Sequence, residues 1–403
     1  MSTRPSSYFS LHPGRTAIPA LDGLRGIAIV MVVLYHGFES FGAKEGQLLP
    51  FTGWDLATPF YSGWMGVNLF FVLSGFLITY HLVRRWQVGT EPIALREYLS
   101  RRFLRIVPTY YVVLAVTAAG LVPYYTVDPN LMGLQLAWHA VFLQDYLPSS
   151  ILGPFWSLGV EEKFYLAMPL AVVLAARLPS LRARLGLLLG IALLSLLIRI
   201  ALYGGMEVLR ADRFIRNWRN PFHMNLDSLL LGALAAWLLL ERDRIPLLQR
   251  ARLPAWLVMI GAALVAALMV APAVLADTRV FYHVAVFPLT ALGMALVLFG
   301  SALKPAGTSP LLENRWLARA GRIAYPWYLT HVLVLHWVWG AMTARLPALL
   351  ALDPQAQLAA FLPVYLTASL AAGILLHFAV EKPCLILKDR VGRRPAALTT
   401  EPA

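Results

Sequence analysis

Long apolar stretches alternate with short polar connections along the whole chain. Ten of these stretches are about 20 residues long, which is the length of helix that crosses the hydrocarbon core of a bilayer. They lie near residues 18–38, 62–83, 103–122, 155–176, 185–203, 223–240, 254–275, 282–300, 323–344 and 361–380. The pattern predicts an all-α, polytopic membrane protein with about ten transmembrane helices.

The basic residues are divided unequally between the connections. If the N-terminus is cytoplasmic, the inner segments contain 24 Lys and Arg residues and the outer ones 7. Because Lys and Arg are enriched in cytoplasmic loops, this bias predicts that both termini are cytoplasmic. We expect tails at residues 1–17 and 387–403 and one membrane domain over residues 18–386. The bias also accounts for most of the net charge of +13 without a nucleic-acid partner.

The composition agrees with this class of protein. Of the 403 residues, 59% are hydrophobic and 14% are charged, and the mean hydropathy is +0.65, whereas about 25% of the residues in a soluble domain are charged. Cys384 is the single cysteine, which excludes an internal disulfide. The first apolar stretch has no clear cleavage site, so we expect it to be retained as a span rather than removed as a signal peptide.

Two outer connections have unusual sequences. Residues 124–154 contain no Lys or Arg, and their middle, MGLQLAWHAVFL, is apolar enough for a short interfacial or re-entrant helix. Residues 207–220 instead contain Arg210, Arg213, Arg216 and Arg219. If this loop is helical, Arg213 and Arg216 share one face. They could bind an anionic acceptor, or they could contact lipid phosphates and neighbouring acidic residues.

The first span carries ionisable residues at both of its ends. Arg25 and His36 are eleven residues apart, which places them on one face of a helix and separates them by roughly 16 Å along its axis. Charged residues within spans are costly and are therefore candidates for function, so we expect both side chains to point into one cavity. Alternatively, Arg25 reaches lipid headgroups with Asp22 as its ion-pair partner, and His36 is a hydrogen-bonded packing residue.

Charged residues also lie at the ends of the third and fourth spans. The segment FWSLGVEEKFYL places Glu161 inside the fourth span, where its carboxylate could orient the imidazole of His36 or simply favour the positive end of a helix dipole. Arg102 and Arg105 share one face at the cytoplasmic end of the third span. Such a pair suits phosphate groups, but it could also be a topology signal that contacts anionic lipid.

Further polar residues lie within the other spans. Asn68 and Ser74 occur in the second span, Asp227 in the sixth and His331 in the ninth. Each is either a cavity residue or a partner in helix packing or an interhelical hydrogen bond. The sequence contains no serine nucleophile elbow, no P-loop and no cluster with metal-ligand spacing. We therefore expect no metal site, no bound cofactor and no covalent serine mechanism.

Six motifs occur in an order that resembles one protein family. They are LDGLRGIAIVMVVLYHG, GVNLFFVLSGFLI, RRFLRIVPTYY, FWSLGVEEKFYL, AYPWYLTHVLV and VEKPCL. Together they resemble the acyltransferase-3 family of membrane O-acyltransferases over about residues 17–386. The resemblance implies ten spans and the transfer of an acyl group, usually acetyl from cytoplasmic acetyl-CoA as co-substrate, to a hydroxyl. It also implies an acceptor that is an extracytoplasmic or lipid-linked carbohydrate of the cell envelope.

The resemblance assigns roles to individual residues. It implies that His36 is the essential histidine and that Arg25 is its paired basic residue. It implies that Glu161 ends a motif that begins with Trp156 and Ser157, and that Arg102 and Arg105 form a basic pair. The remaining substrate-binding candidates are Asp22, Ser74, His331, Arg213 and Arg216.

These roles predict a mechanism. Arg25, Arg102 and Arg105 would hold the CoA phosphates, while His36 would act as general base on the acceptor hydroxyl, oriented by Glu161. A transient acyl-histidine is the other possible route. Longer members of the family append an esterase-like domain, whereas this sequence continues for only about 20 residues after its last predicted span, so we expect any second transfer step to need a separate partner or not to occur.

A secondary transporter or flippase of a lipid-linked sugar is the alternative class of function, with the same charges acting as a proton relay. Such transporters commonly have repeated halves, and we find no repeat of fixed period in the sequence. We expect a multi-pass protein of the bacterial cytoplasmic membrane that contacts the lipid bilayer, an acyl-CoA and a hydroxylated acceptor.

Overall fold

The computed structural model describes residues 18–41, 48–52, 54–88, 94–147, 149, 151–203, 219–275, 280–304 and 309–391. Nearly all of these residues are helical. The strands in this part of the chain are β1 (Pro50–Phe51) and β2 (Trp54–Asp55), which form one antiparallel hairpin. The all-α fold predicted from the hydrophobic pattern is therefore confirmed.

Each of the ten predicted apolar stretches falls on a long helix. These helices are α2 (Ala20–Glu39), α4 (Met65–Val88), α5 (Leu95–Ala118), α7 (Trp156–Ala176), α8 (Leu181–Tyr203), α10 (Leu226–Leu240), α11 (Leu253–Val274), α12 (Val286–Leu303), α14 (Ala324–Arg345) and α15 (Pro354–Leu376). A short 3₁₀ helix, η3 (Phe222–Asn225), leads into α10, and a π-helical segment, η6 (Phe281–Ala285), leads into α12. The π-helical segment η8 (His377–Glu381) continues α15 directly into α16 (Lys382–Val391).

Within the described ranges, seven helical segments are long and apolar enough to cross a membrane. They are Ala20–Glu39, Met65–Gln87, Leu181–Tyr203, Phe222–Leu240, Leu253–Val274, Phe281–Leu303 and Pro354–Arg390. The other three predicted spans correspond to α5, α7 and α14, which carry Arg102, Glu161 and His331. The multi-pass membrane architecture is thus supported, whereas the count of ten spans and the cytoplasmic position of both termini remain predictions.

Short elements connect the long helices. They are α3 (Thr58–Tyr61), α6 (Pro129–Ala140), α13 (Arg315–Arg322) and the turns η1 (Gly153–Phe155), η4 (Arg242–Arg244), η5 (Pro246–Gln249) and η7 (Pro347–Ala351). Helix α6 begins after Asp128, whose side chain accepts a hydrogen bond from the backbone N–H of Asn130. It confirms the short helix predicted within residues 124–154, while its place at the membrane remains a prediction.

Helix α4 forms the centre of the bundle. It packs against α2, α7, α10 and α12. A Cβ added to Gly75 would lie 1.9 Å from the carbonyl oxygen of Leu229, and one added to Gly232 would lie 2.1 Å from that of Val72. Small residues let the backbones of membrane helices approach closely. The two glycines therefore hold α4, which carries Ser74, against α10.

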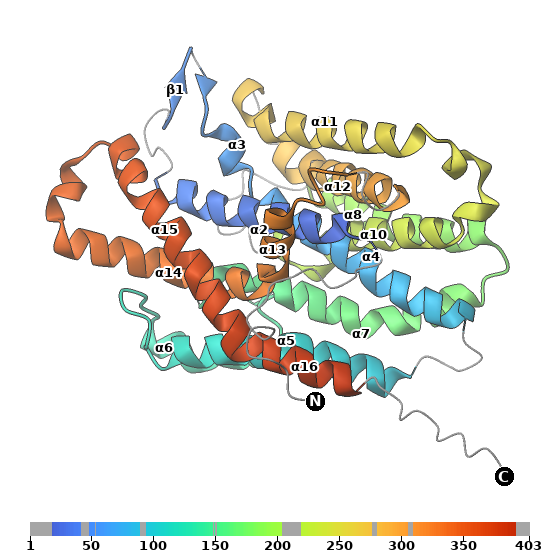
Figure 1. Ribbon diagram of the computed structural model, residues 1–403, viewed down its shortest axis with the longest axis horizontal. Coiled ribbons are helices and arrows are strands. Elements are labelled where there is room, and N and C mark those ends of the chain that lie inside the picture. The colour runs from blue at the N-terminus through green and yellow to red at the C-terminus, as the bar shows by residue number, and fades with distance from the viewer. Residues whose placement is uncertain are drawn as a thin grey trace, which may run out of the picture.

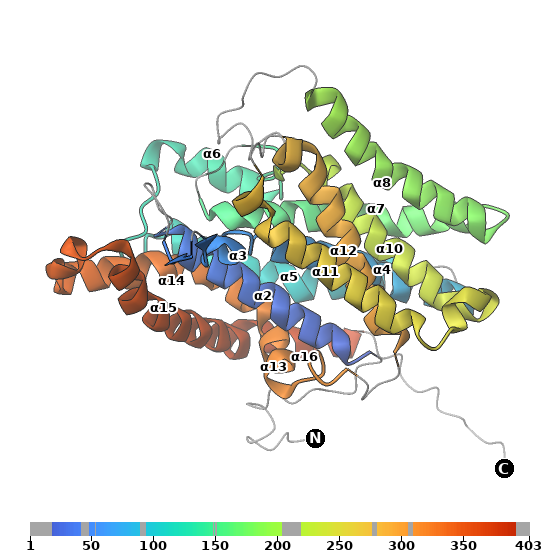
Figure 2. The same cartoon turned by 90° about the horizontal axis from the view of Figure 1, so that it is seen from above.

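The remaining helices surround this centre. Figure 1 shows α5 and α16 side by side along the lower side of the bundle and α11 along the upper side. Figure 2 shows α8 at one edge of the bundle and the α14–α15 pair at the other end. Only 22% of the apolar stretch of α8 and 17% of that of α11 are buried. These apolar outer faces are suited to contact with lipid chains.

Candidate active site

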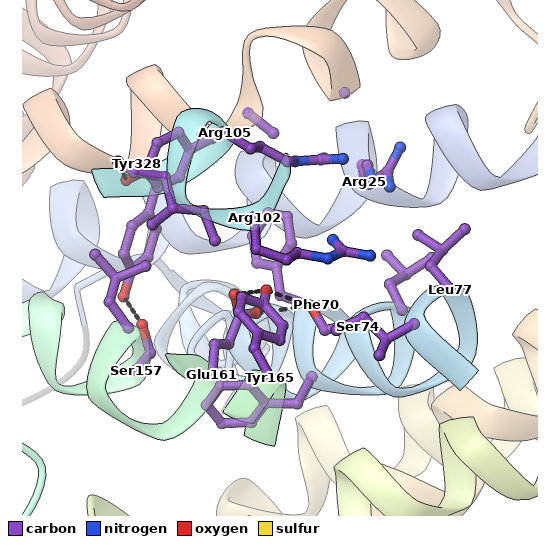
Figure 3. Close-up of a pocket in the computed structure, with 18 of the residues that line it drawn as sticks. Arg25, Phe70, Ser74, Leu77, Arg102, Arg105, Ser157, Glu161, Tyr165 and Tyr328 are labelled. Atoms are coloured by element: carbon purple, nitrogen blue, oxygen red, sulfur yellow. Dashed lines mark hydrogen bonds between the residues drawn. The ribbon is translucent and has the colours of Figure 1, made fainter. Parts of the chain in front are cut away.

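A cavity of about 160 Å³ lies among α2, α4, α5, α7 and α14. Six of the residues singled out from the sequence line it: Arg25, Ser74, Arg102, Arg105, Ser157 and Glu161. They come from four helices that are far apart in the sequence and converge in space (Figure 3). The structure thus brings most of the predicted polar residues of these spans to one place.

Three guanidinium groups converge at one end of this cavity. Arg102 and Arg105 extend from α5 towards Arg25 on α2 (Figure 3). Arg25 forms an ion pair with buried Asp22 at 3.1 Å, and the same carboxylate lies 3.8 Å from Arg322 on α13. Within the described part of the chain, neither Arg102 nor Arg105 forms an ion pair with a carboxylate. The positive charge is therefore only partly balanced, and this end of the cavity is suited to an anion.

A larger cleft of about 630 Å³ adjoins the cavity at its basic end. The two spaces share His81, Arg102 and Arg105, and the cleft adds the basic residues Arg84, Arg85, Arg101 and Lys388. Arg102 lies over the rings of Tyr98 and Tyr165 at 5.7 and 5.4 Å. These cation–π contacts fix its guanidinium at the junction of the two spaces.

Glu161 lies in the middle of the cavity, where it accepts two hydrogen bonds. Ser74 Oγ donates to its Oε1 at 2.8 Å, and the hydroxyl of Tyr165 donates to its Oε2 at 2.5 Å. The expectation that Glu161 orients His36 is therefore wrong. The physical reason is that this turn of α7 faces α4 at Ser74, whereas His36 lies at the far end of α2 beside α14.

The partner of His36 is instead His331. The Nε2 atom of His331 lies 3.2 Å from Nδ1 of His36, and Nδ1 of His36 also lies 2.9 Å from the carbonyl oxygen of Val32. The Nδ1 atom of His331 lies 2.6 Å from the carbonyl oxygen of Tyr328. His331 is fully buried, and His36 is half-buried. The sequence had marked both histidines but did not pair them.

The cavity ends before it reaches His36. Val67 is the lining residue nearest to the start of α4, and its neighbour Gly66 packs against Ala28, Met31 and Val32 of α2. His36 lies one helical turn beyond Val32. The expectation that Arg25 and His36 line one cavity is thus wrong for His36, which is not among the residues that line it.

Tyr328 connects the cavity to the two histidines. Its hydroxyl donates to the carbonyl oxygen of Pro154 at 2.5 Å and lies 2.7 Å from Oγ of Ser157, while its carbonyl contacts His331. Trp156, next to Ser157, is buried against Phe71 and does not line the cavity. Ser157 is therefore a cavity residue, whereas Trp156 packs behind it.

Arg219 is the one arginine of the outer loop that the structure describes; Arg210, Arg213 and Arg216 lie outside the described residues. Its guanidinium lies over the rings of Trp64 and Trp156 at 5.8 and 5.6 Å. Trp64 follows Gly63, which packs against Met31 and Tyr35 of α2, so Arg219 lies towards the end of α2 that carries His36. A basic residue of the predicted outer side therefore lies beside the histidine pair.

Other polar residues of the spans make interhelical contacts away from the cavity. Asp227 lies 3.8 Å from the fully buried Arg199. Asn68 donates to Ser228 Oγ at 3.1 Å. Lys163 Nζ donates to Asp145 at 2.6 Å and so ties the outer connection to α7. Asp227 and Asn68 are therefore partners in interhelical contacts and do not line the cavity.

Several lining residues had not been recognised from the sequence. They are Tyr165, Tyr328, Arg322 and Glu381, of which Glu381 lies 2.5 Å from His377. The signal that could have identified Glu381 and His377 is the one that marked His331: each is an ionisable residue at a predicted span. No group of three or more His, Cys, Asp or Glu side chains that could hold a metal occurs among the residues whose positions are described.

Two curated proteins illustrate what the chain is similar to. A 203-residue match to the peptidoglycan O-acetyltransferase OatA of Listeria monocytogenes is 30% identical and covers 47% of this chain and 30% of that protein. A 171-residue match to the O-acetyltransferase OatA of Staphylococcus aureus is 29% identical and covers 38% of this chain and 24% of that protein. The matched part thus spans less than a third of the length of either relative.

A family model extends the likeness to nearly the whole chain. No solved structure matches the chain. The model of the acyltransferase-3 family, described as an acyltransferase domain, matches residues 18–378. These residues include α2, α4, α5, α7 and α14, which carry the cavity and the two histidines. The chain therefore belongs to the acyltransferase-3 family.

Proposed function

We propose that this protein is a membrane O-acyltransferase. It moves an acyl group, acetyl in the first instance, from a cytoplasmic acyl-CoA to a hydroxyl of an extracytoplasmic or lipid-linked carbohydrate. The observation that carries the proposal is that the two ends of a membrane-embedded cavity differ. A cluster of arginines lies at one end, and a histidine pair lies beyond the other. Family membership favours this enzyme over a transporter that would use the same charges as a relay.

The donor binds at the basic end. Arg25, Arg102 and Arg105 offer guanidinium groups that form paired, charge-assisted hydrogen bonds with phosphate oxygens. The adjoining cleft of about 630 Å³ accommodates the nucleotide part of the donor, since ligand sites typically measure roughly 300–1,000 Å³. The narrower cavity, with Phe70 and Leu77 in its wall (Figure 3), suits the slender acyl-bearing arm.

The acyl group is transferred at the other end. Tyr328 and Ser157 line the cavity there, and Tyr328 lies one turn before His331 on α14. The donor arm therefore displaces the side chain of Tyr328 or Phe70 when it delivers the thioester, and His36 acts as general base on the acceptor hydroxyl. A transient acyl-histidine is the other route that this arrangement allows.

The acceptor approaches from the side of Arg219. Held over Trp64 and Trp156, this guanidinium acts on His36 from the predicted outer face. An anionic group on the acceptor, such as a carboxylate of the stem peptide on a muramyl disaccharide, would be drawn to it. The names of the two curated relatives make a peptidoglycan fragment the first acceptor to test.

The test uses purified protein in nanodiscs with ¹³C-acetyl-CoA and a muramyl disaccharide peptide. Release of free CoA is followed together with the mass of the acetylated sugar. We expect transfer by the natural protein and a loss of about 10²- to 10⁴-fold in His36→Ala, which is the usual contribution of a positioned acid–base group. Trp337→Ala, at an exposed position of α14, serves as the control and keeps full activity.

Two results separate the parts of the proposal. Near-normal transfer by well-folded His36→Ala would overturn the general-base mechanism. Transfer from acetyl phosphate but not from acetyl-CoA would overturn the donor and leave the acyl-transfer reaction in place.

A further inference from the structure

His36 and His331 contact each other through their imidazole rings. The Nε2 atom of His331 lies 3.2 Å from Nδ1 of His36, and the ring centroids are 4.8 Å apart. The two residues are 295 positions apart in the sequence and come from α2 and α14. The contact is therefore a product of the fold, and it lies at the reacting end of the site.

Backbone carbonyls determine which ring nitrogens carry hydrogen. Nδ1 of His36 faces the carbonyl oxygen of Val32 at 2.9 Å, and Nδ1 of His331 faces that of Tyr328 at 2.6 Å. Because a carbonyl oxygen only accepts hydrogen bonds, both Nδ1 atoms are donors, and in a neutral imidazole the Nε2 atom then holds the lone pair. His331 Nε2 thus presents a lone pair to the shared Nδ1–H of His36. The Nε2 atom of His36 keeps its own lone pair, and no hydrogen bond to it occurs among the described residues.

We propose that His331 is a positioning residue for His36, an inference that rests on the proposed acyl transfer. It holds His36 in the tautomer whose Nε2 is free to act as base, and it stabilises the imidazolium that forms. His331 makes no covalent bond in this cycle. Its lone pair accepts the Nδ1–H hydrogen bond, which strengthens while His36 is charged, as the carboxylate does for the histidine of a serine protease.

The transfer step balances without any further reactant. The O–H bond of the acceptor breaks as an N–H bond forms at Nε2 of His36, and the acceptor oxygen bonds to the acyl carbon. The C–S bond of the thioester then breaks. The proton passes from Nε2 of His36 to the departing sulfur, which leaves as free CoA thiol, and His36 returns to its starting tautomer.

No other neighbour described in the structure can accept the Nδ1–H of His36 in this way, apart from the carbonyl of Val32. Tyr35 meets the ring edge-on, with centroids 4.8 Å apart. Arg219 and His336 act on His36 electrostatically, but a guanidinium has no lone pair to offer. The Nδ1 atom of His336 faces a carbonyl of its own helix.

The test compares substitutions at His331 that differ in their ability to accept a hydrogen bond. His331→Leu removes the acceptor, His331→Gln retains an oxygen that reaches His36, and His331→Asn retains an oxygen on a shorter side chain. Trp337→Leu, at an exposed position on the same helix, is the control. The acetyl-CoA and muramyl disaccharide assay gives kcat and KM, and thermal unfolding checks that each variant is folded.

We expect His331→Leu to lower kcat roughly 10- to 100-fold, the value of a hydrogen bond to a charged group, and to leave KM for acetyl-CoA unchanged. His331→Gln should restore most of kcat, and His331→Asn should not. If His331→Leu does not fold, the Gln and Asn variants make the same comparison. In a His36→Ala background, His331→Leu should cause no additional loss, because His331 acts only through His36.

Three outcomes would overturn the inference: unchanged kcat in folded His331→Leu, equal activity of the Gln and Asn variants, or a further loss in the His36→Ala background. A failure of the proposed function gives a different result. In that case His36→Ala itself retains transfer, whatever the behaviour of the His331 variants.

Discussion

At the scale of single residues, Arg105 has the least compensated charge in the cavity. It is half-buried, and it makes no ion pair, hydrogen bond or cation–π contact within the described chain. We expect Arg105→Gln to raise KM for acetyl-CoA about 10- to 100-fold, because hydrogen bonds between charged groups contribute alike to the ground and transition states. The value of kcat should change little. Arg96→Gln, at an exposed position at the start of the same helix, is the control.

Steady-state kinetics with acetyl-CoA as the varied substrate provide the measurement. An unchanged KM in Arg105→Gln would reassign Arg102 and Arg105 to the topology signal that their position near the predicted cytoplasmic face also allows.

Glu161 provides a second prediction at this scale. Its carboxylate lies among Ser74, Tyr165 and the guanidinium of Arg102, away from His36. Glu161→Gln removes a negative charge from the donor end, so the basic cluster should bind CoA phosphates more tightly. We expect KM for acetyl-CoA to fall about two- to fivefold, as for a partly screened charge pair. A fall in kcat as large as that of His36→Ala, with KM unchanged, would instead restore the role of orienting His36.

Single residues also show where the sequence was sufficient and where it was not. The cost of burying charge identified Arg25, His36, Arg102, Glu161 and His331 as candidates without any structure. It could not pair them, because helical spacing relates residues of one helix only. The distance between His36 and His331, and that between Glu161 and Ser74, depends on how separate helices pack.

At the scale of elements, the α4–α10 contact can be tested directly. A Cβ at Gly75 would lie 1.9 Å from the carbonyl oxygen of Leu229, so Gly75→Ala must push the helices apart. We expect a loss of roughly 1–3 kcal/mol in stability, as for other overpacked sites, seen as a lower Tm of the purified protein. Gly186→Ala and Gly190→Ala on α8 are matched controls, since nothing lies within 4 Å of a Cβ at either position.

If Gly75→Ala unfolds at the same temperature as these controls, the close approach of α4 and α10 does not limit stability. A lower Tm with unchanged KM for acetyl-CoA would show that α10 supports α4 without shaping the donor site.

The elements themselves follow closely from the hydrophobic pattern. All ten predicted stretches fall on helices, and even the short helix α6 was foreseen within residues 124–154. The physical reason is that a span must satisfy its backbone hydrogen bonds internally, which leaves a helix as the simplest solution. The π-helical segment η8, which brings Glu381 to the cavity, has no comparable signal, because it lies within one continuous apolar helical segment, Pro354–Arg390.

At the scale of the whole molecule, the proposed reaction requires a donor on one side of the membrane and an acceptor on the other. The basic cleft contains Arg84, Arg101 and Lys388, which come from segments predicted to be cytoplasmic. The histidine pair lies at the opposite end of α2, near Arg219 of a predicted outer loop. The two-sided reaction therefore depends on α5, α7 and α14 crossing the bilayer, although these helices are not among the seven described segments that are long and apolar enough to do so by composition.

Cysteine labelling tests whether α5, α7 and α14 cross the bilayer. In a Cys384→Ser background, which removes the single cysteine, one cysteine at a time is placed on either side of α5, α7 and α14. If these helices span the membrane, a membrane-impermeant maleimide should label Asn130→Cys and Leu350→Cys in intact cells, and should label Arg96→Cys, Ser180→Cys and Trp316→Cys only after permeabilisation. The asymmetry is expected because a maleimide that cannot cross the bilayer reaches thiols on one face alone. Labelling of Asn130→Cys and Ser180→Cys from the same side would mean that α7 does not cross, and the donor and acceptor would then have to meet on one face of the membrane.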